Sequence, residues 1–155
     1  DVLSLNDLCA LRVDRLASRD AVLFLWATGP KMREALCVMG EWGFTYLTVG
    51  FTWVKRYRNG SQYSGLGHYT KSGTEFVLLG RRGKPLPRLR HDVRQIVEAP
   101  VTRHSAKPPE VRERIVQLFG DRPRLEMFAR EACPGWISWG LGVPACLPYN
   151  ISKDT

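Results

Sequence analysis

The chain lacks the sequence features of several protein classes. Its longest apolar run, Ala21 to Ala27, is far too short to cross a bilayer. Its four cysteines form no CxxC pair, and none stands at metal-ligand spacing from a histidine. The sequence also has no basic start followed by an apolar signal segment. We therefore expect reduced thiols, no metal site, no membrane span and a cytoplasmic location.

Common phosphate-binding and hydrolase motifs are missing as well. Neither Gly65-x-Gly67 nor Gly140-x-Gly142 has the third glycine of a dinucleotide fingerprint, and the chain has no Gly-Lys-Ser/Thr phosphate loop. It has no Gly-x-Ser-x-Gly elbow either. These absences argue against a nicotinamide enzyme, an ATPase and a serine hydrolase.

Acidic residues are in the minority. The chain has 23 Lys and Arg against 15 Asp and Glu, which gives a formal net charge of +8 and a pI of about 9.7. Such a positive field attracts polyanions, so nucleic acid is the first candidate partner, and a solvated basic surface is the alternative. The proline-interrupted basic segment from Arg81 to His91 has the same two interpretations, phosphate contact or solvated linker.

The length and the 44% hydrophobic content predict one α/β domain over residues 1–143, followed by an irregular tail at 144–155. Apolar periodicity, capping residues and turn residues predict helices at 4–17, 32–43 and 108–120 and strands at 21–27, 45–55, 74–80, 95–99, 124–129 and 136–140. This alternation predicts a mixed, mostly parallel sheet flanked by helices with right-handed crossovers. The continuous apolar run at 21–27 is typical of a central parallel strand.

The stretch from Phe51 to Gly83 is the candidate pocket. A strand ending in Trp53 and Lys55 enters a glycine-rich loop, and the returning strand begins near Glu75. The loop glycines allow a close backbone approach or a positive φ. An aromatic ring, a cation and a carboxylate are therefore expected to share one edge of the sheet.

A known family shares several of these residues in the same order. The chain resembles the MT-A70 family of S-adenosylmethionine-dependent adenine N6-methyltransferases, from about Leu3 to Val143. The general character of its sequence (below, its texture) is closest to the bacterial or phage branch of that family. The resemblance implies a Rossmann-like class I methyltransferase fold with the cofactor at the carboxyl ends of the strands. It is carried by six segments: Trp53-Val54-Lys55; Gly65-Leu66-Gly67-His68-Tyr69; Glu75 with Leu78-Leu79-Gly80; His104-Ser105-Ala106-Lys107-Pro108-Pro109-Glu110; Glu126-Met127-Phe128-Ala129-Arg130; and Pro134-Gly135-Trp136 with Trp139-Gly140.

The resemblance also implies roles for individual residues. On the cofactor side, Lys107 would meet the methionine carboxylate, Phe128 would flank the adenine or ribose, and Arg130 would bind the ribose hydroxyls, with Gly140 close by. The alternatives are a surface lysine, a core aromatic and a basic strand end. The substrate side would comprise Trp53, Lys55, Tyr69, Glu75 and Ser105, although Trp53 can equally be a packing residue. Lys55, Glu75, Lys107 and Arg130 would wall one cavity.

The sequence departs from the family pattern in two ways. The catalytic Asp-Pro-Pro-Trp segment is absent, because the only Pro-Pro is Pro108-Pro109, so no catalytic residue is assigned. We expect that segment upstream of Asp1, in an N-terminal portion of the domain. Relatives usually place an amide or acidic side chain where this chain has Leu141-Gly142, which puts cofactor affinity in question.

The leading hypothesis is methyl transfer to the N6 amine of adenine in nucleic acid. DNA is favoured over RNA by the bacterial-like texture alone, and a homodimer or heterodimer is left open. The main alternative is a catalytically inactive partner subunit that keeps the fold and binds nucleic acid. A basic α/β domain of unrelated chemistry would require the six ordered segments to match by chance.

Overall fold

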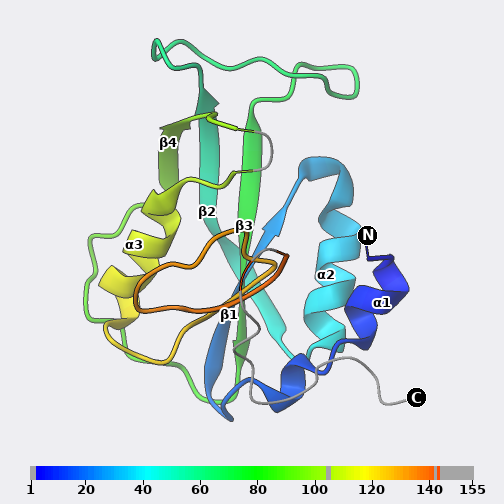
Figure 1. Ribbon diagram of the computed structural model, residues 1–155, viewed down its shortest axis with the longest axis vertical. Helices are drawn as coiled ribbons and strands as arrows, with labels where there is room; N and C mark the ends of the chain where they lie inside the picture. The colour runs from blue at the N-terminus through cyan, green and yellow to red at the C-terminus, as the bar shows by residue number, and fades with distance from the viewer. Residues whose placement is uncertain (1–2, 104–105, 142, 144–155) are drawn as a thin grey trace.

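The computed structural model describes residues 3–103, 106–141 and 143 (Figure 1). The helices are α1 (Leu5–Ala10), α2 (Met32–Glu41) and α3 (Pro109–Phe119), with short 3₁₀ turns at Val13–Arg15 and Gly29–Lys31. The strands are β1 (Ala21–Ala27), β2 (Thr45–Arg56), β3 (Thr74–Arg82), β4 (Ile96–Pro100), β5 (Leu125–Met127) and β6 (Ile137–Trp139).

A mixed four-stranded sheet is the centre of the fold. Its strand order is β1-β3-β2-β4, and β3 runs antiparallel to both β1 and β2, whereas β4 is parallel to β2. Strands β1, β2 and β4 therefore point in one direction, and their carboxyl ends lie together at one end of the sheet. We call this end, where the strands terminate, the carboxyl edge of the sheet. Strands β5 and β6 form a separate parallel pair.

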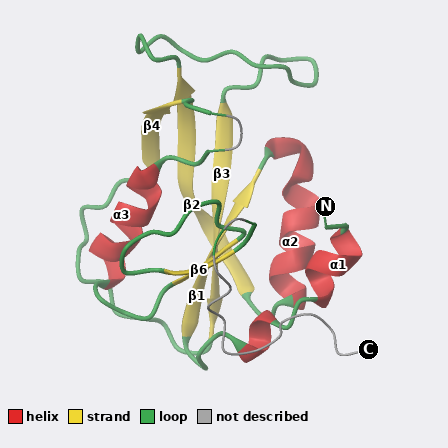
Figure 2. Cartoon of the chain, viewed as in Figure 1, coloured by secondary structure: helices red, strands yellow, loops and turns green. Residues whose placement is uncertain are grey.

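Helices cover the two faces of this sheet, as the residue alternation of the strands requires (Figure 2). Leu23 and Leu25 of β1 pack into a cluster with Val38 and Met39 of α2 and with Trp42, which directly follows α2. Phe24 and Trp26, which alternate with them, pack into a second cluster that contains Val111, Ile115 and Leu118 of α3. The α1–α2 layer and α3 therefore lie on opposite faces.

The position of β1 differs from the prediction. Among the described residues β1 is an edge strand, and its pairing with β3 is antiparallel rather than parallel. Two of the three pairings in the four-stranded sheet are antiparallel, so this sheet is mixed as predicted but not mostly parallel. Both of its faces are nevertheless covered by helices, because its alternate residues belong to the two hydrophobic clusters. A continuous apolar run reports coverage of both faces, and it carries no information about the order of strands within the sheet.

The first helix is shorter than the pattern predicted. The capping box of Ser4 and Asp7 forms as expected, but the backbone becomes extended at Leu11 and the second half of the segment is a 3₁₀ turn. The indole N–H of Trp42 donates to the carbonyl of Leu8 at 2.7 Å, a carbonyl that a longer helix would have paired with residue 12. A tertiary hydrogen bond thus takes the place of the next helical turn.

The other predicted elements are confirmed with shifted ends. Helix α2 is followed by Gly43 with φ 83°, and α3 ends at Gly120 with φ 72°. Strand β3 continues to Arg82, whose guanidinium donates to the carbonyl of Asp14 at 2.9 Å, so part of the basic segment belongs to the sheet. Strands β5 and β6 are three residues each, and Phe128, with φ 61°, ends β5.

Two further expectations concern the whole chain. Among the described residues, no helix is long and apolar enough to cross a membrane. The division into a domain at 1–143 and a tail at 144–155 stays a prediction, because the tail lies outside the described residues. The cytoplasmic location also stays a prediction.

Candidate functional site

The candidate site lies at the edge of the sheet where β1, β2 and β4 end and β3 begins. Register places Trp53 of β2 opposite Glu75 of β3, as the sequence predicted. Lys55 follows two residues after Trp53, so both side chains leave the same face of β2. Lys107 comes from the segment that follows β4 and enters α3.

A buried carboxylate joins the two lysines. The Nζ atom of Lys55 is 2.8 Å from Oε1 of Glu75, and Nζ of Lys107 forms an ion pair with Oε2 of the same carboxylate. Glu75 is only 8% exposed, whereas the side chain of Lys107 is 34% exposed. We call these three residues the Lys–Glu–Lys cluster. Its two cations and one anion leave one net positive charge at the rim of the sheet.

Aromatic rings surround the cluster. Nζ of Lys55 lies 5.0 Å from the ring centroid of Trp53 and 5.8 Å from that of Tyr63, and Nζ of Lys107 lies 5.2 Å from the Trp26 ring. Trp26 and Trp53 meet edge to face with centroids 6.1 Å apart. The indole N–H of Trp53 donates to the carbonyl of Ala99 at 2.9 Å, which fixes its ring against β4. Rings in this arrangement favour cations and planar ligands.

The ionisation of Glu75 follows from these neighbours. Burial works to raise the pKa of Glu75, but hydrogen bonds and charge from Lys107 and Lys55 prevail and hold that pKa below its ordinary value. Glu75 is therefore a carboxylate at neutral pH, and each of its two oxygens pairs with one of the lysines.

A second group of predicted residues lies on the β5–β6 pair. Phe128 is 44% exposed, and its ring meets Trp139 edge to face at 5.2 Å. A Cβ atom at Gly140 would lie 2.2 Å from the carbonyl oxygen of Ala129, so only glycine lets β6 approach this turn so closely. Arg130 follows directly and is exposed.

The predicted cavity of four residues is only partly assembled by contacts. Lys55 and Lys107 each form an ion pair with Glu75. Arg130 follows β5 and is exposed, and its place in the predicted cavity stays a prediction. Tyr69 is fully exposed in the loop between β2 and β3. Ser105 lies outside the described residues. The roles of all these residues stay predictions.

Sequence reasoning missed two aromatic residues of the site. Trp26 contacts Lys107, and Tyr63 contacts Lys55. A signal for Trp26 was available, since it stands at the carboxyl end of a strand parallel in direction to β2, as Trp53 does. Tyr63 stands in an irregular loop, and no periodic pattern points to it.

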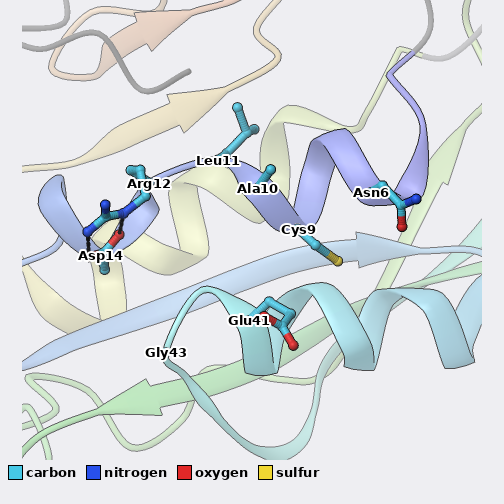
Figure 3. A pocket seen from close by; sticks show the side chains of 8 residues that line it. All are labelled: Asn6, Cys9, Ala10, Leu11, Arg12, Asp14, Glu41 and Gly43. Carbon is cyan, nitrogen blue, oxygen red and sulfur yellow. Dashed lines mark hydrogen bonds and ion pairs between the residues drawn. The ribbon is translucent and has the colours of Figure 1, made fainter. Parts of the chain in front are cut away.

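One hollow in the described surface lies away from the Lys–Glu–Lys cluster. This hollow of about 540 Å³ lies between α1 and the end of α2, and an ion pair of Arg12 with Asp14, 2.8 Å long, closes one side (Figure 3). It shares no residue with the Lys–Glu–Lys cluster and lies on the opposite face of the sheet. Among the described residues, no group of three His, Cys, Asp or Glu side chains could hold a metal ion. The hollow is lined by Asn6, Cys9, Ala10, Leu11, Arg12, Asp14, Glu41 and Gly43.

A mixed sheet with helices on both faces and a charged, aromatic-walled candidate site where its strands end defines an α/β domain. The MT-A70 family model matches residues 1–142, and the chain belongs to the MT-A70 family. This family assignment agrees with the resemblance that the sequence motifs indicated.

Named relatives are similar over most of the chain. It is 40% identical over 143 residues to the type II methyltransferase M.MunI of a Mycoplasma species, covering 92% of this chain and 59% of the relative. It is 31% identical over 155 residues to the mouse N(6)-adenine-specific methyltransferase METTL4, covering 89% of this chain and 32% of that relative. The catalytic subunit METTL3 of the human N(6)-adenosine-methyltransferase is 29% identical over 125 residues, covering 78% and 21%. The chain thus spans less than two thirds of each of these relatives.

Replacing Glu75 by Gln keeps the shape of the side chain and removes its charge. Both ammonium groups then lose their counterion, and we expect the free energy of unfolding to fall by about 2 kcal/mol, a value kept modest because water screens the partly exposed Lys107. Urea unfolding measures the change. The matched control is Glu98→Gln, which breaks an exposed pair with Arg56 and should change stability by less than about 0.5 kcal/mol. Equal effects of the two substitutions would contradict a special role for the cluster.

The lowered pKa of Glu75 also predicts a pH dependence. A carboxyl whose pKa is lower in the folded state stabilises the fold above its unfolded value of 4.5 and loses that contribution as the pH falls through the folded-state pKa. The stability difference between wild type and Glu75→Gln should therefore be constant between pH about 7 and about 5, and it should shrink in more acidic buffer. Urea unfolding at each pH tests this, and a difference that grows in acid would contradict it.

Proposed function

We propose that this chain forms the methyltransferase domain of an adenine N6-methyltransferase that acts on nucleic acid, with a Rossmann-like class I fold. The observation that carries the proposal is the Lys–Glu–Lys cluster, walled by Trp26 and Trp53, at the edge where strands of one direction end. Open α/β sheets bind their ligands at that edge. Family membership and the names of the relatives support the reaction.

The described residues fit S-adenosylmethionine as the cofactor. That molecule carries a carboxylate and an adenine ring, and the cluster offers one net positive charge beside aromatic faces. Lys107 would hold the carboxylate, because its ammonium group is the more exposed of the two lysines. Phe128 and Arg130 would contact the adenosine part, and Gly140 would let their turn sit close to β6. When bound, the cofactor supplies an electrophilic methyl group.

The adenine would lie on the side of Trp53, Lys55 and Glu75. An exocyclic adenine amine is a poor nucleophile, since its lone pair is delocalised into the ring, so the protein must orient it with acceptors while an aromatic ring stacks on the base. The charged Glu75 is one such acceptor. The Asp-Pro-Pro-Trp segment of the family would supply others, and its place upstream of residue 1 remains a prediction.

DNA remains the favoured substrate in this proposal, and RNA is the alternative. The relatives' names divide between adenine-specific and adenosine methyltransferases, so these names alone do not decide. The bacterial or phage-like texture of the sequence is the reason for preferring DNA. A homodimer or heterodimer is compatible with either substrate.

A second candidate function is that of a nucleic-acid-binding partner subunit without transferase activity. Leu141-Gly142, where relatives usually place an amide or acidic side chain, favours it. The net charge of +8 suits either function, because both require binding to a polyanion.

Transfer of a labelled methyl group separates the two functions. We expect a gene product extended upstream of residue 1 to methylate adenine-containing DNA, and to methylate RNA of the same sequence more slowly. Scintillation counting and detection of N6-methyladenine measure the product, and DNA whose adenines are already methylated is the control. An extended protein that binds nucleic acid but neither transfers methyl nor binds the cofactor would support the partner-subunit function instead.

Cofactor affinity tests the role of Lys107. Replacing Lys107 by Ala should raise the dissociation constant of S-adenosylmethionine by roughly tenfold to a hundredfold, since a charge-assisted hydrogen bond is lost. Isothermal calorimetry gives the constant. The control Lys31→Ala removes an exposed lysine paired with Glu34 at 2.9 Å, and it should leave the affinity unchanged. Equal affinities of wild type and the Lys107 variant would remove the residue from the site.

A further inference from the structure

The loop between β2 and β3 ends in an exposed apolar tip, formed by residues 65–72. Tyr69 is fully exposed, and Leu66 is 95% exposed. Figure 1 shows this loop extending beyond the end of the sheet, on the side where β2 ends. Two large apolar side chains exposed this fully within one short projecting turn are candidates for a contact with another molecule.

Backbone hydrogen bonds hold the tip in one shape. The amide N–H of Gly65 donates to the carbonyl of Ser72 at 2.7 Å, and the N–H of Ser72 donates back at 3.1 Å. A Cβ atom at Gly67 would lie 2.4 Å from the carbonyl oxygen of Thr70, so the turn requires glycine there. Tyr69 has φ 63°, in the left-handed region that bulky residues rarely adopt. The tip is thus a closed turn that presents the tyrosine ring outward.

Tyr63 connects the tip to the Lys–Glu–Lys cluster. A Cβ atom at Gly65 would lie 3.0 Å from the Tyr63 ring, and the same ring lies 5.8 Å from Nζ of Lys55. The Tyr57 ring also packs against the Tyr63 ring, with centroids 5.1 Å apart. The tip therefore lies at the rim of the candidate site. A long ligand bound in the candidate site would pass the tip.

The charge of this region suits one kind of ligand. Residues 42–74 include no aspartate or glutamate, and the loop carries Arg58 and Lys71, both exposed. A cationic surface with interleaved aromatic rings is complementary to nucleic acid, whose phosphates and bases it contacts together. A protein partner would require no such depletion of acidic residues.

We propose that the tip at residues 65–72 is a nucleic-acid contact in which Tyr69 stacks on a base beside the target adenine, Leu66 packs against a base next to it, and Lys71 contacts a phosphate. The position of the target base rests on the proposed function. An adenine drawn out of its stack leaves the faces of its neighbours uncovered, and an aromatic or apolar side chain can cover them. The exposed ring of Tyr69 is available for that contact before the nucleic acid binds.

Binding of a fluorescein-labelled duplex, measured by fluorescence anisotropy at several salt concentrations, tests the contact. Replacing Tyr69 by Asn removes the ring and keeps a residue that tolerates the left-handed backbone. We expect it to weaken binding about tenfold without changing the salt dependence, since one stacked base is lost. Tyr69→Phe should bind like wild type. Lys71→Ala should instead reduce the slope of log affinity against log salt by about one.

The matched control is Tyr46→Asn, which removes an exposed tyrosine 43% accessible at the opposite end of β2. Its affinity and salt slope should equal those of wild type. Circular dichroism and urea unfolding confirm that each variant is folded. Unchanged affinity of both Tyr69→Asn and Lys71→Ala would overturn the proposal, and so would loss of a dimer in Tyr69→Asn with DNA and RNA affinity unchanged, because the tip would then be a protein interface.

The outcomes also separate this contact from the proposed function. If the tip variants weaken binding while no extended product transfers methyl, the tip is a nucleic-acid contact and the transferase proposal fails. If methyl is transferred while the tip variants bind and react like wild type, the transferase proposal stands and the tip contact fails.

Discussion

The carboxylate of Glu75, held between Lys55 and Lys107, is the interaction on which the site depends. A buried carboxylate is costly unless cations and hydrogen bonds compensate it, and here two segments distant in sequence supply them. Antiparallel pairing of β2 with β3 brings one lysine within reach, and the entry to α3 brings the other. The Glu75 side chain thus joins strands β2 and β3 to the segment that enters α3, where β1, β2 and β4 end.

The candidate site consists of three parts that differ in the chemical groups they present. The Lys–Glu–Lys cluster supplies charge in a half-buried setting, and Trp26 and Trp53 supply flat walls beside it. The β5–β6 pair presents Phe128 in a turn that depends on glycine at position 140. The β2–β3 loop extends outward from the same edge. A small ligand would need the first two parts, and a polymer would need the loop as well.

Much of the fold could be predicted because many helices and strands depend on residues close to one another in the sequence. The capping box at Ser4 marks a helix start, the apolar stripe of α2 marks a helix packed on one face, and the β-branched run of β2 marks a strand. Each of these elements forms where its pattern predicted it. The errors occurred where a distant residue decided the outcome. Trp42 takes the carbonyl that would have extended α1, and the pairing with β3 places β1 at the edge of the described sheet.

The candidate site was likewise predicted in part from the sequence and decided in part by the tertiary structure. By itself, the sequence determined which residue types were available and that strands ending at Lys55 and beginning at Glu75 would meet, since both follow from strand pattern and chain order. Only the tertiary structure decided that Lys107 joins the same carboxylate, that the Trp26 ring lies beside Lys107, and that the Tyr63 ring lies beside Lys55. The physical reason is that ion pairs and ring contacts depend on how separate elements pack against each other, and no local pattern of residues carries that information.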